Sequence, residues 1–155
     1  AAALGMTVLY NDIKPIELDY PSTAVDKPDL YRRSDIVTIH VPLTSLTRHL
    51  VNKQTLGRFK QGAQFINAAR GGCMVAPDVA AAIKSGQLSA AAIDCQEPEP
   101  PPMDYPLYGL ENVILTPHVA ARVPQALAAM CDVVYDVVAV LEGRKPQYPA
   151  EEGGY

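Results

Sequence analysis

The sequence predicts an α/β protein built on a parallel β-sheet. Short apolar runs of about four to six residues alternate with stretches of helical periodicity, which is the pattern of βαβ units. Several runs are apolar throughout, as in strands that are buried on both faces of a parallel sheet. In addition, polar residues typical of binding sites directly follow these runs, at the strand ends where open α/β sheets bind ligands.

The first part of the chain is predicted to hold a helix end, two strands and a short helix. Gly5 ends the helix, and residues 6–12 form a strand that finishes in Asp12. An acid there can accept hydrogen bonds from the hydroxyls of an adenosine ribose, but Asp is also a common first residue of turns. A proline-containing loop follows, with an edge strand at 23–25 and a helix at 29–33.

The middle of the chain leads to the most informative segment. A second strand covers residues 34–44, and Asn52 is expected to cap a helix that runs to about residue 59. A third strand at 64–66 leads into Ala-Ala-Arg-Gly-Gly, where the two glycines allow a sharp turn through positive φ. The guanidinium of Arg70 suits a carboxylate or a carbonyl oxygen; the alternative is a surface arginine in a turn.

The last third repeats the alternation of strand and helix. A helix is predicted at 77–85, a strand at 89–93 and a strand at 112–115. Asp94 and a proline-rich acidic loop follow the first of these strands, and Thr-Pro-His118 follows the second. A long apolar helix is expected over 123–142, ahead of a loose polar tail.

Four groups of interest therefore fall beyond the carboxyl ends of predicted parallel strands. They are Asp12, Arg70, the loop with Asp94 and Glu99, and His118. Because these strand ends share one edge of the sheet, the side chains should converge on one crevice. Arginine can hold a carboxylate, histidine can exchange a proton near neutral pH, and a carboxylate can fix the histidine tautomer. No nucleophile lies beside a base, which disfavours acyl transfer.

Composition excludes several other classes of function. A net charge of −4 over 155 residues argues against a nucleic-acid partner. No uninterrupted apolar run reaches about 18 residues, so no membrane span is expected. Three widely spaced cysteines favour a reducing compartment, hence the cytoplasm, with the thiols as core filler rather than disulfides or zinc ligands. His40 and His49 lack partners at metal-binding spacing, and no metal site is predicted.

The ordered motifs resemble those of the D-isomer-specific 2-hydroxyacid dehydrogenases. The family pattern has a strand ending in an acid, then S-D-I-V-x-x-H-x-P-L-T, N-x-A-R-G, D-x-x-x-x-E-P and T-P-H. This chain has matching residues in that order, from about residue 5 to residue 146. The resemblance implies a Rossmann-like doubly wound parallel sheet that binds NAD, and a small 2-oxo or 2-hydroxy acid as substrate.

The resemblance also implies roles for individual residues. Arg70 would bind the substrate carboxylate and carbonyl oxygen, His118 would be the acid/base, and Glu99 would orient it. Asp12 would hold the adenosine ribose and favour NAD over NADP, and Asp94 would contact the carboxamide end of the nicotinamide. The remaining cofactor-lining residues would be Thr44, Ala68, Ala69 and Ala121, together with His118. Relatives dimerise through this domain, so a homodimer is expected for the full-length protein. Other relatives act as NAD-sensing scaffolds for protein partners, which is the alternative to an enzyme.

Two family features are missing from this sequence. It has no G-x-G-x-x-G phosphate loop and no substrate domain, so the sheet is expected to be incomplete, without its first, central strand. We therefore expect residues upstream of Ala1, and a gap between the strands at 7–11 and 36–40. Residues 1–146 are assigned to a partial NAD-binding domain and 147–155 to a loose tail. Cys95-Gln96 stands where the family commonly has Val-Phe.

Overall fold

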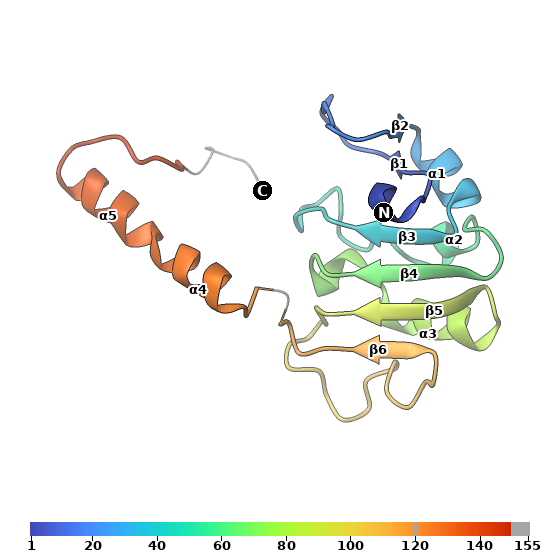
Figure 1. Ribbon diagram of the computed structural model, residues 1–155. Helices are drawn as coiled ribbons and strands as arrows, with labels where there is room; N and C mark the ends of the chain where they lie inside the picture. Colours follow the sequence, from blue (N-terminus) through green and yellow to red (C-terminus); the bar gives the residue numbers. More distant parts are fainter. Residues whose placement is uncertain (120, 150–155) are drawn as a thin grey trace.

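The computed structural model describes residues 1–119 and 121–149 and is organised around a parallel sheet (Figure 1). Four strands pair in the order β3-β4-β5-β6, all parallel. Two shorter strands, β1 and β2, form a separate parallel pair. This arrangement confirms the predicted α/β class with a parallel, Rossmann-like sheet.

The predicted strands and helices are present with shifted ends, except that the helix expected over 123–142 is divided into two. In chain order the elements are η1 (Ala2–Leu4), β1 (Leu9–Tyr10), β2 (Thr23–Ala24), α1 (Lys27–Arg33), β3 (Ile36–Ile39), α2 (Lys53–Leu56), β4 (Ala63–Asn67), η2 (Gly71–Cys73), α3 (Ala76–Lys84), β5 (Leu88–Ile93), β6 (Val113–Leu115), α4 (Pro124–Cys131) and α5 (Val133–Leu141).

Capping explains where two of the helices begin. Asn52 caps α2 as predicted, and its side chain accepts hydrogen bonds from the backbone N–H groups of Gln54 and Thr55. Helix α1 begins two residues earlier than expected, because the carboxylate of Asp26 accepts the N–H of Asp29 at 2.8 Å. Pro28 occupies the first turn of α1, where a missing N–H costs nothing.

The expected gap in the sheet is confirmed. Within the described residues β1 pairs with β2, with Leu9 opposite Thr23, and β3 pairs with β4, but β1 and β3 belong to different sheets. The four-stranded sheet therefore ends at β3 on this side. A Rossmann sheet places its central strand between the two halves, and none of the described residues supplies it.

The core lies between the sheet and helices α2 and α3, and the central strands provide most of it. Phe65 of β4 and Leu88 of β5 are fully buried. Tyr31 stacks on Phe59, which meets Phe65 edge to face, so an aromatic chain ties α1 to β4. Burying each such side chain contributes about 1.5–3 kcal/mol. Burial alternates along β3 and β4, so one face of the sheet is covered and the other is largely open.

Helices α4 and α5 differ most from expectation. One helix was predicted over 123–142, but two form, because the helical hydrogen bonding is interrupted around Asp132, a weak helix former. Both extend away from the sheet, and their apolar side chains are mostly exposed (Figure 1). The 18-residue stretch Pro124–Leu141 is long and apolar enough to cross a membrane, which the sequence reasoning missed because Asp132 and Asp136 interrupt the run. Two carboxylates make such a span costly.

The tail and the cysteines give two further outcomes. The N–H groups of Gln147 and Tyr148 donate to the carboxylate of Asp136 at 2.6 and 2.9 Å, so the start of the predicted loose tail is anchored; residues 150–155 lie outside the described residues. Cys73 and Cys95 are buried as predicted, whereas Cys131 is exposed on α4 and is not core filler.

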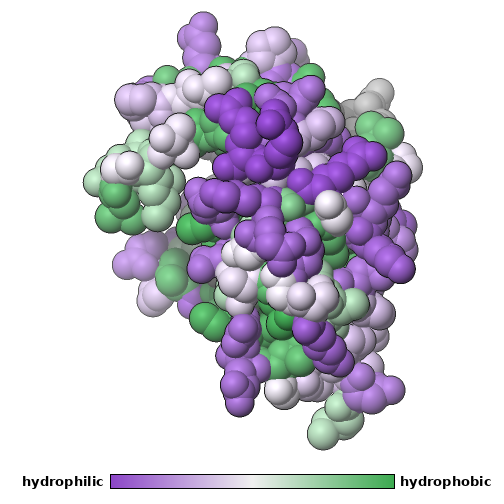
Figure 2. Space-filling model, turned by 90° about the vertical axis from the view of Figure 1, so that its right-hand side faces the viewer, coloured by the Kyte–Doolittle hydropathy of each residue, from purple (hydrophilic) through white to green (hydrophobic). Residues whose placement is uncertain are grey.

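The amino-terminal end of the sheet, viewed in Figure 2, presents mainly hydrophilic side chains with interspersed apolar ones.

Candidate functional site

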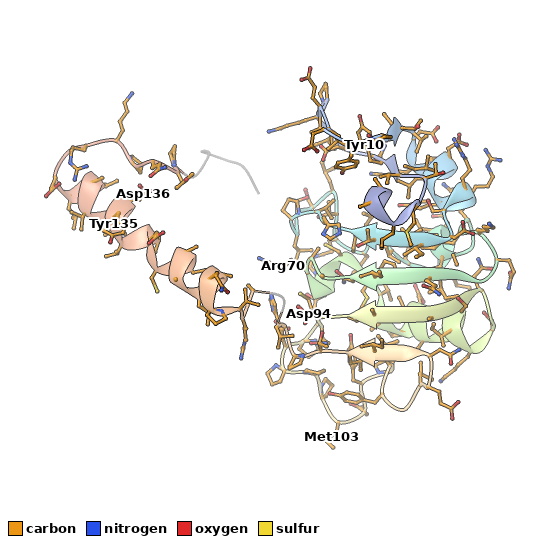
Figure 3. The ribbon with its side chains drawn as sticks, viewed as in Figure 1. Tyr10, Arg70, Asp94, Met103, Tyr135 and Asp136 are labelled. Carbon is orange, nitrogen blue, oxygen red and sulfur yellow. The ribbon has the colours of Figure 1, made fainter. Side chains whose placement is uncertain are left out.

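The candidate site lies at the carboxyl ends of β4, β5 and β6, which are adjacent and parallel. In Figure 3, Arg70 and Asp94 lie at this same end of the sheet, one beyond β4 and the other beyond β5. The thiol of Cys95 donates to the carbonyl of Ala69 at 3.4 Å and so joins the two strand ends. Topology thus brings together segments that are far apart in the sequence.

The turn that presents Arg70 is held by a buried asparagine. The side-chain oxygen of Asn67 accepts from the N–H of Ala69, and its amide group donates to the carbonyl of Arg70, each at 3.0 Å. Arg70 itself is exposed and donates one N–H to the carbonyl of Ala69 at 2.7 Å. Beside it lies a hollow of about 270 Å³, lined by His40, Val41, Pro42, Ala68, Ala69 and Arg70.

The two glycines after Arg70 allow a close approach of backbone, not a positive φ. Neither is among the residues with positive φ, which corrects the reason given from the sequence. A Cβ on Gly71 would lie 2.0 Å from the carbonyl oxygen of Gln96, and one on Gly72 would lie 3.0 Å from the carboxylate of Glu97. The glycines therefore let the loop that carries Glu99 lie directly on the turn after β4.

A buried carboxylate organises the turn that carries the histidine. Asp94 accepts the hydroxyl of Thr116 at 2.5 Å and the N–H of Val119 at 2.9 Å. The backbone N–H of His118 donates to the carbonyl of Asp94 at 2.8 Å. These contacts hold His118 at φ 52°, a left-handed conformation that a residue with a side chain adopts only when its surroundings impose it.

His118 and Glu99 form the predicted pair. Nδ1 of the imidazole lies 3.0 Å from Oε2 of the carboxylate, and both side chains are partly exposed. A carboxylate acceptor at Nδ1 keeps a proton on that nitrogen, which leaves Nε2 to exchange a proton with another molecule. The arrangement suits proton transfer to or from an oxygen atom.

Comparison with protein-family sequence models matches residues 1–120 to the family described as D-isomer specific 2-hydroxyacid dehydrogenase, NAD binding domain. The chain belongs to this family. It is 37% identical over 150 residues to a glyoxylate reductase of Thermofilum pendens, covering 94% of this chain and 44% of the relative.

Solved structures agree with this assignment. The holo form of D-mandelate dehydrogenase from Rhodotorula graminis superposes with a TM-score of 0.87 at 30% identity, covering 96% of this chain and 45% of that one. A probable 2-hydroxyacid dehydrogenase from Rhizobium etli, in complex with NADP, gives a TM-score of 0.83 at 26% identity, covering 99% and 51%. The chain thus spans about half the length of the relatives it matches.

The residues present fit a dinucleotide at two points. Asp12 is exposed beside a hollow of about 400 Å³ that it lines with Tyr10 and Asn11, and its Oδ1 accepts the N–H of Lys14 at 2.9 Å. Its second oxygen could accept a ribose hydroxyl. At the other end, Ala68 and Ala69 line the hollow beside Arg70 with small side chains. The printed sequence has no G-x-G-x-x-G motif, and a contact of Asp12, Ala68 or Ala69 with a dinucleotide stays a prediction.

The remaining predicted cofactor residues are less directly placed. Thr44 lies two residues beyond Pro42, and its hydroxyl accepts the N–H of Leu46 at 3.2 Å, so it shapes the loop after β3. Ala121 is exposed in the turn before α4. For both residues, as for Asp94, a contact with the cofactor stays a prediction. His40 and His49 are exposed, as expected of surface histidines.

Supporting residues were harder to assign from the sequence than the reactive ones. Gln96, noted only as a departure from the family, is buried and donates to the carbonyl of Thr116 at 2.9 Å. It thereby joins the loop after β5 to the turn that carries His118. Burial raises the pKa of the Cys95 thiol beneath this loop, and the carboxylates of Asp94 and Glu99 raise it further. The thiol is thus a neutral packing group.

Proposed function

We propose that this chain provides the NAD-binding and acid/base part of an enzyme that interconverts a D-2-hydroxyacid and a 2-oxoacid. The contact between Nδ1 of His118 and Oε2 of Glu99 at 3.0 Å carries the proposal. A histidine oriented in this way, at the strand-end edge that also carries Arg70, matches the requirements of carbonyl reduction. Family membership and the hollow beside Arg70 support it.

The roles follow from the chemistry of each group. The Arg70 guanidinium, of which the described contacts use one N–H, has further donors for the substrate carboxylate and carbonyl oxygen. In the reductive direction His118 delivers a proton from Nε2 to the carbonyl oxygen; in the oxidative direction Nε2 removes the hydroxyl proton. Glu99 accepts the Nδ1–H group and so holds the ring in one orientation. When bound, NAD supplies or accepts the hydride.

The preference for NAD is a finer part of the proposal. If Asp12 holds the adenosine ribose, a 2′-phosphate would meet its carboxylate, and like charges repel. A relative in complex with NADP shows that family membership by itself does not decide the cofactor. Location in the cytoplasm and a homodimer stay predictions from the sequence.

The test is turnover by the full-length protein that carries this chain. NADH oxidation is followed by the loss of its near-ultraviolet absorbance, with glyoxylate, hydroxypyruvate and phosphohydroxypyruvate as substrates. We expect turnover with at least one of them, and Glu99→Gln should lower kcat more than it raises KM, because it removes the charge that orients the ring. No oxidation with any 2-oxoacid, together with retained NAD binding, would favour a non-catalytic scaffold.

A further inference from the structure

The loop that carries Glu99 takes part in a second ion pair. Arg48, in the loop after β3, places one guanidinium nitrogen 3.2 and 3.4 Å from the two carboxylate oxygens of Glu97. Glu97 lies two residues before Glu99 in the loop after β5. The pair therefore connects the loop after β3 to the segment from which Glu99 projects.

The backbone around Arg48 is fixed to the turn after β4. The N–H of His49 donates to the carbonyl of Gly72 at 2.8 Å, and the N–H of Val51 donates to the carbonyl of Cys73 at 3.0 Å. These hydrogen bonds hold the backbone next to Arg48 against the turn after β4. A charged nitrogen held in this way can fix the position of the carboxylate that it contacts.

The carboxylate of Glu97 is confined from the opposite side as well. Its oxygens lie over Gly72, where an added Cβ would come within 3.0 Å of Oε2 and also within 3.0 Å of Leu43. Behind it, the Gln96–Glu97 peptide rests on Gly71. Three loops thus meet at Glu97, and each of them leads from a strand of the sheet.

We propose that the Arg48–Glu97 ion pair is a positioning device that sets the orientation of Glu99 and, through Glu99, the tautomer of His118. Its effect on the reaction rests on the proposed function, but its effect on the imidazole does not. Neither residue lines the hollow beside Arg70, although Glu97 lines a separate hollow of about 350 Å³ with His49 and Pro98. In this proposal both residues act on His118 only through Glu99. Both side chains are about half exposed, at 50% and 43%, so the pair contributes little to global stability and its loss should leave the fold intact.

The test reads the ring of His118 directly in the 155-residue chain. Long-range ¹H–¹⁵N spectra, recorded at about pH 9 where imidazoles are neutral, distinguish a proton on Nδ1 from one on Nε2. In the wild type we expect the Nδ1–H form to dominate. Arg48→Ala and Glu97→Gln should each reduce its population by about half or more, and Arg48→Lys should restore much of it because the charge is kept.

Arg33→Ala is the matched control. Arg33 is a partly exposed arginine that pairs with Asp29 at 3.7 Å on α1, and its removal should leave the His118 spectrum unchanged. In the full-length protein Arg48→Ala should lower kcat about five- to tenfold with little change in KM. An unchanged tautomer and unchanged kcat in Arg48→Ala overturn this inference while leaving the proposed function intact. If Arg48→Ala shifts the tautomer in the 155-residue chain but the wild-type full-length protein shows no turnover, the positioning role is supported and the proposed function is overturned.

Discussion

Replacing Gly71 by alanine is the sharpest test of how the site is packed. The added Cβ would lie 2.0 Å from the oxygen and 2.2 Å from the carbon of the Gln96 carbonyl group. Heavy atoms reach van der Waals contact at about 3.5–4.0 Å, so the two backbones must separate by about 1.5 Å (3.5 minus 2.0). Overpacking of this kind costs about 1–3 kcal/mol, and more when both partners are backbone. For a chain of this size the melting temperature should fall by about 2–12 °C.

The matched control is Gly57→Ala. Gly57 has φ −65° and ψ −11°, and its added Cβ would meet its nearest neighbour at an ordinary 3.5 Å. Alanine fits this conformation and reduces the entropy of the unfolded chain, which should stabilise the protein by about 0.4–1 kcal/mol. Thermal unfolding followed by circular dichroism measures both variants. The same substitution should thus have opposite signs at the two sites, and a Gly71→Ala protein as stable as the wild type would refute the close contact.

Three further predictions concern the reaction, the cofactor and the thiols. In the full-length protein His118→Gln should lower kcat about 10²–10⁴-fold, the usual contribution of general acid/base catalysis, with cofactor affinity retained in a fluorescence titration. Asp12→Asn should weaken NADH binding about tenfold or more and improve NADPH binding, since it removes a charged acceptor and a repulsion; an unchanged ratio of the two dissociation constants would remove Asp12 from the ribose site. In the native chain a thiol reagent should modify Cys131 quickly and the other two slowly, because burial raises the pKa of Cys73 and Cys95. A raised pKa favours the neutral thiol in the folded state. The contribution of the two buried thiols to the free energy of unfolding is therefore fully present below the pKa of an unfolded thiol, and it declines as pH rises above that pKa.

Much of the fold could be predicted because the strands are marked by local patterns. Apolar β-prone runs located all of the sheet strands to within a few residues. Two helix boundaries differ from the prediction. Asp26 caps a helix that was expected to begin two residues later. Asp132 interrupts a helix whose apolar periodicity continues past it. Aspartate favours both turns and caps, so its identity does not distinguish them.

The site residues were predictable where their chemistry is distinctive, and their supports were not. Arg70, Glu99 and His118 follow from strand ends and residue types. By contrast, the positive φ of His118 depends on the carbonyl of Asp94 in another loop, and the need for glycine at 71 depends on the approach of Gln96. Such constraints arise from tertiary contacts between segments that the sequence does not show to be adjacent.

The central claim is that Arg70, Glu99 and His118 act on one substrate. A crystal structure of the full-length protein with NAD and oxamate, an analogue of a 2-oxoacid, tests it most directly. We expect the Arg70 guanidinium on the carboxylate of oxamate and Nε2 of His118 within hydrogen-bond distance of its carbonyl oxygen, with Glu99 on Nδ1. An analogue bound away from Arg70, or a His118 ring that turns Nε2 away from it, would contradict the account.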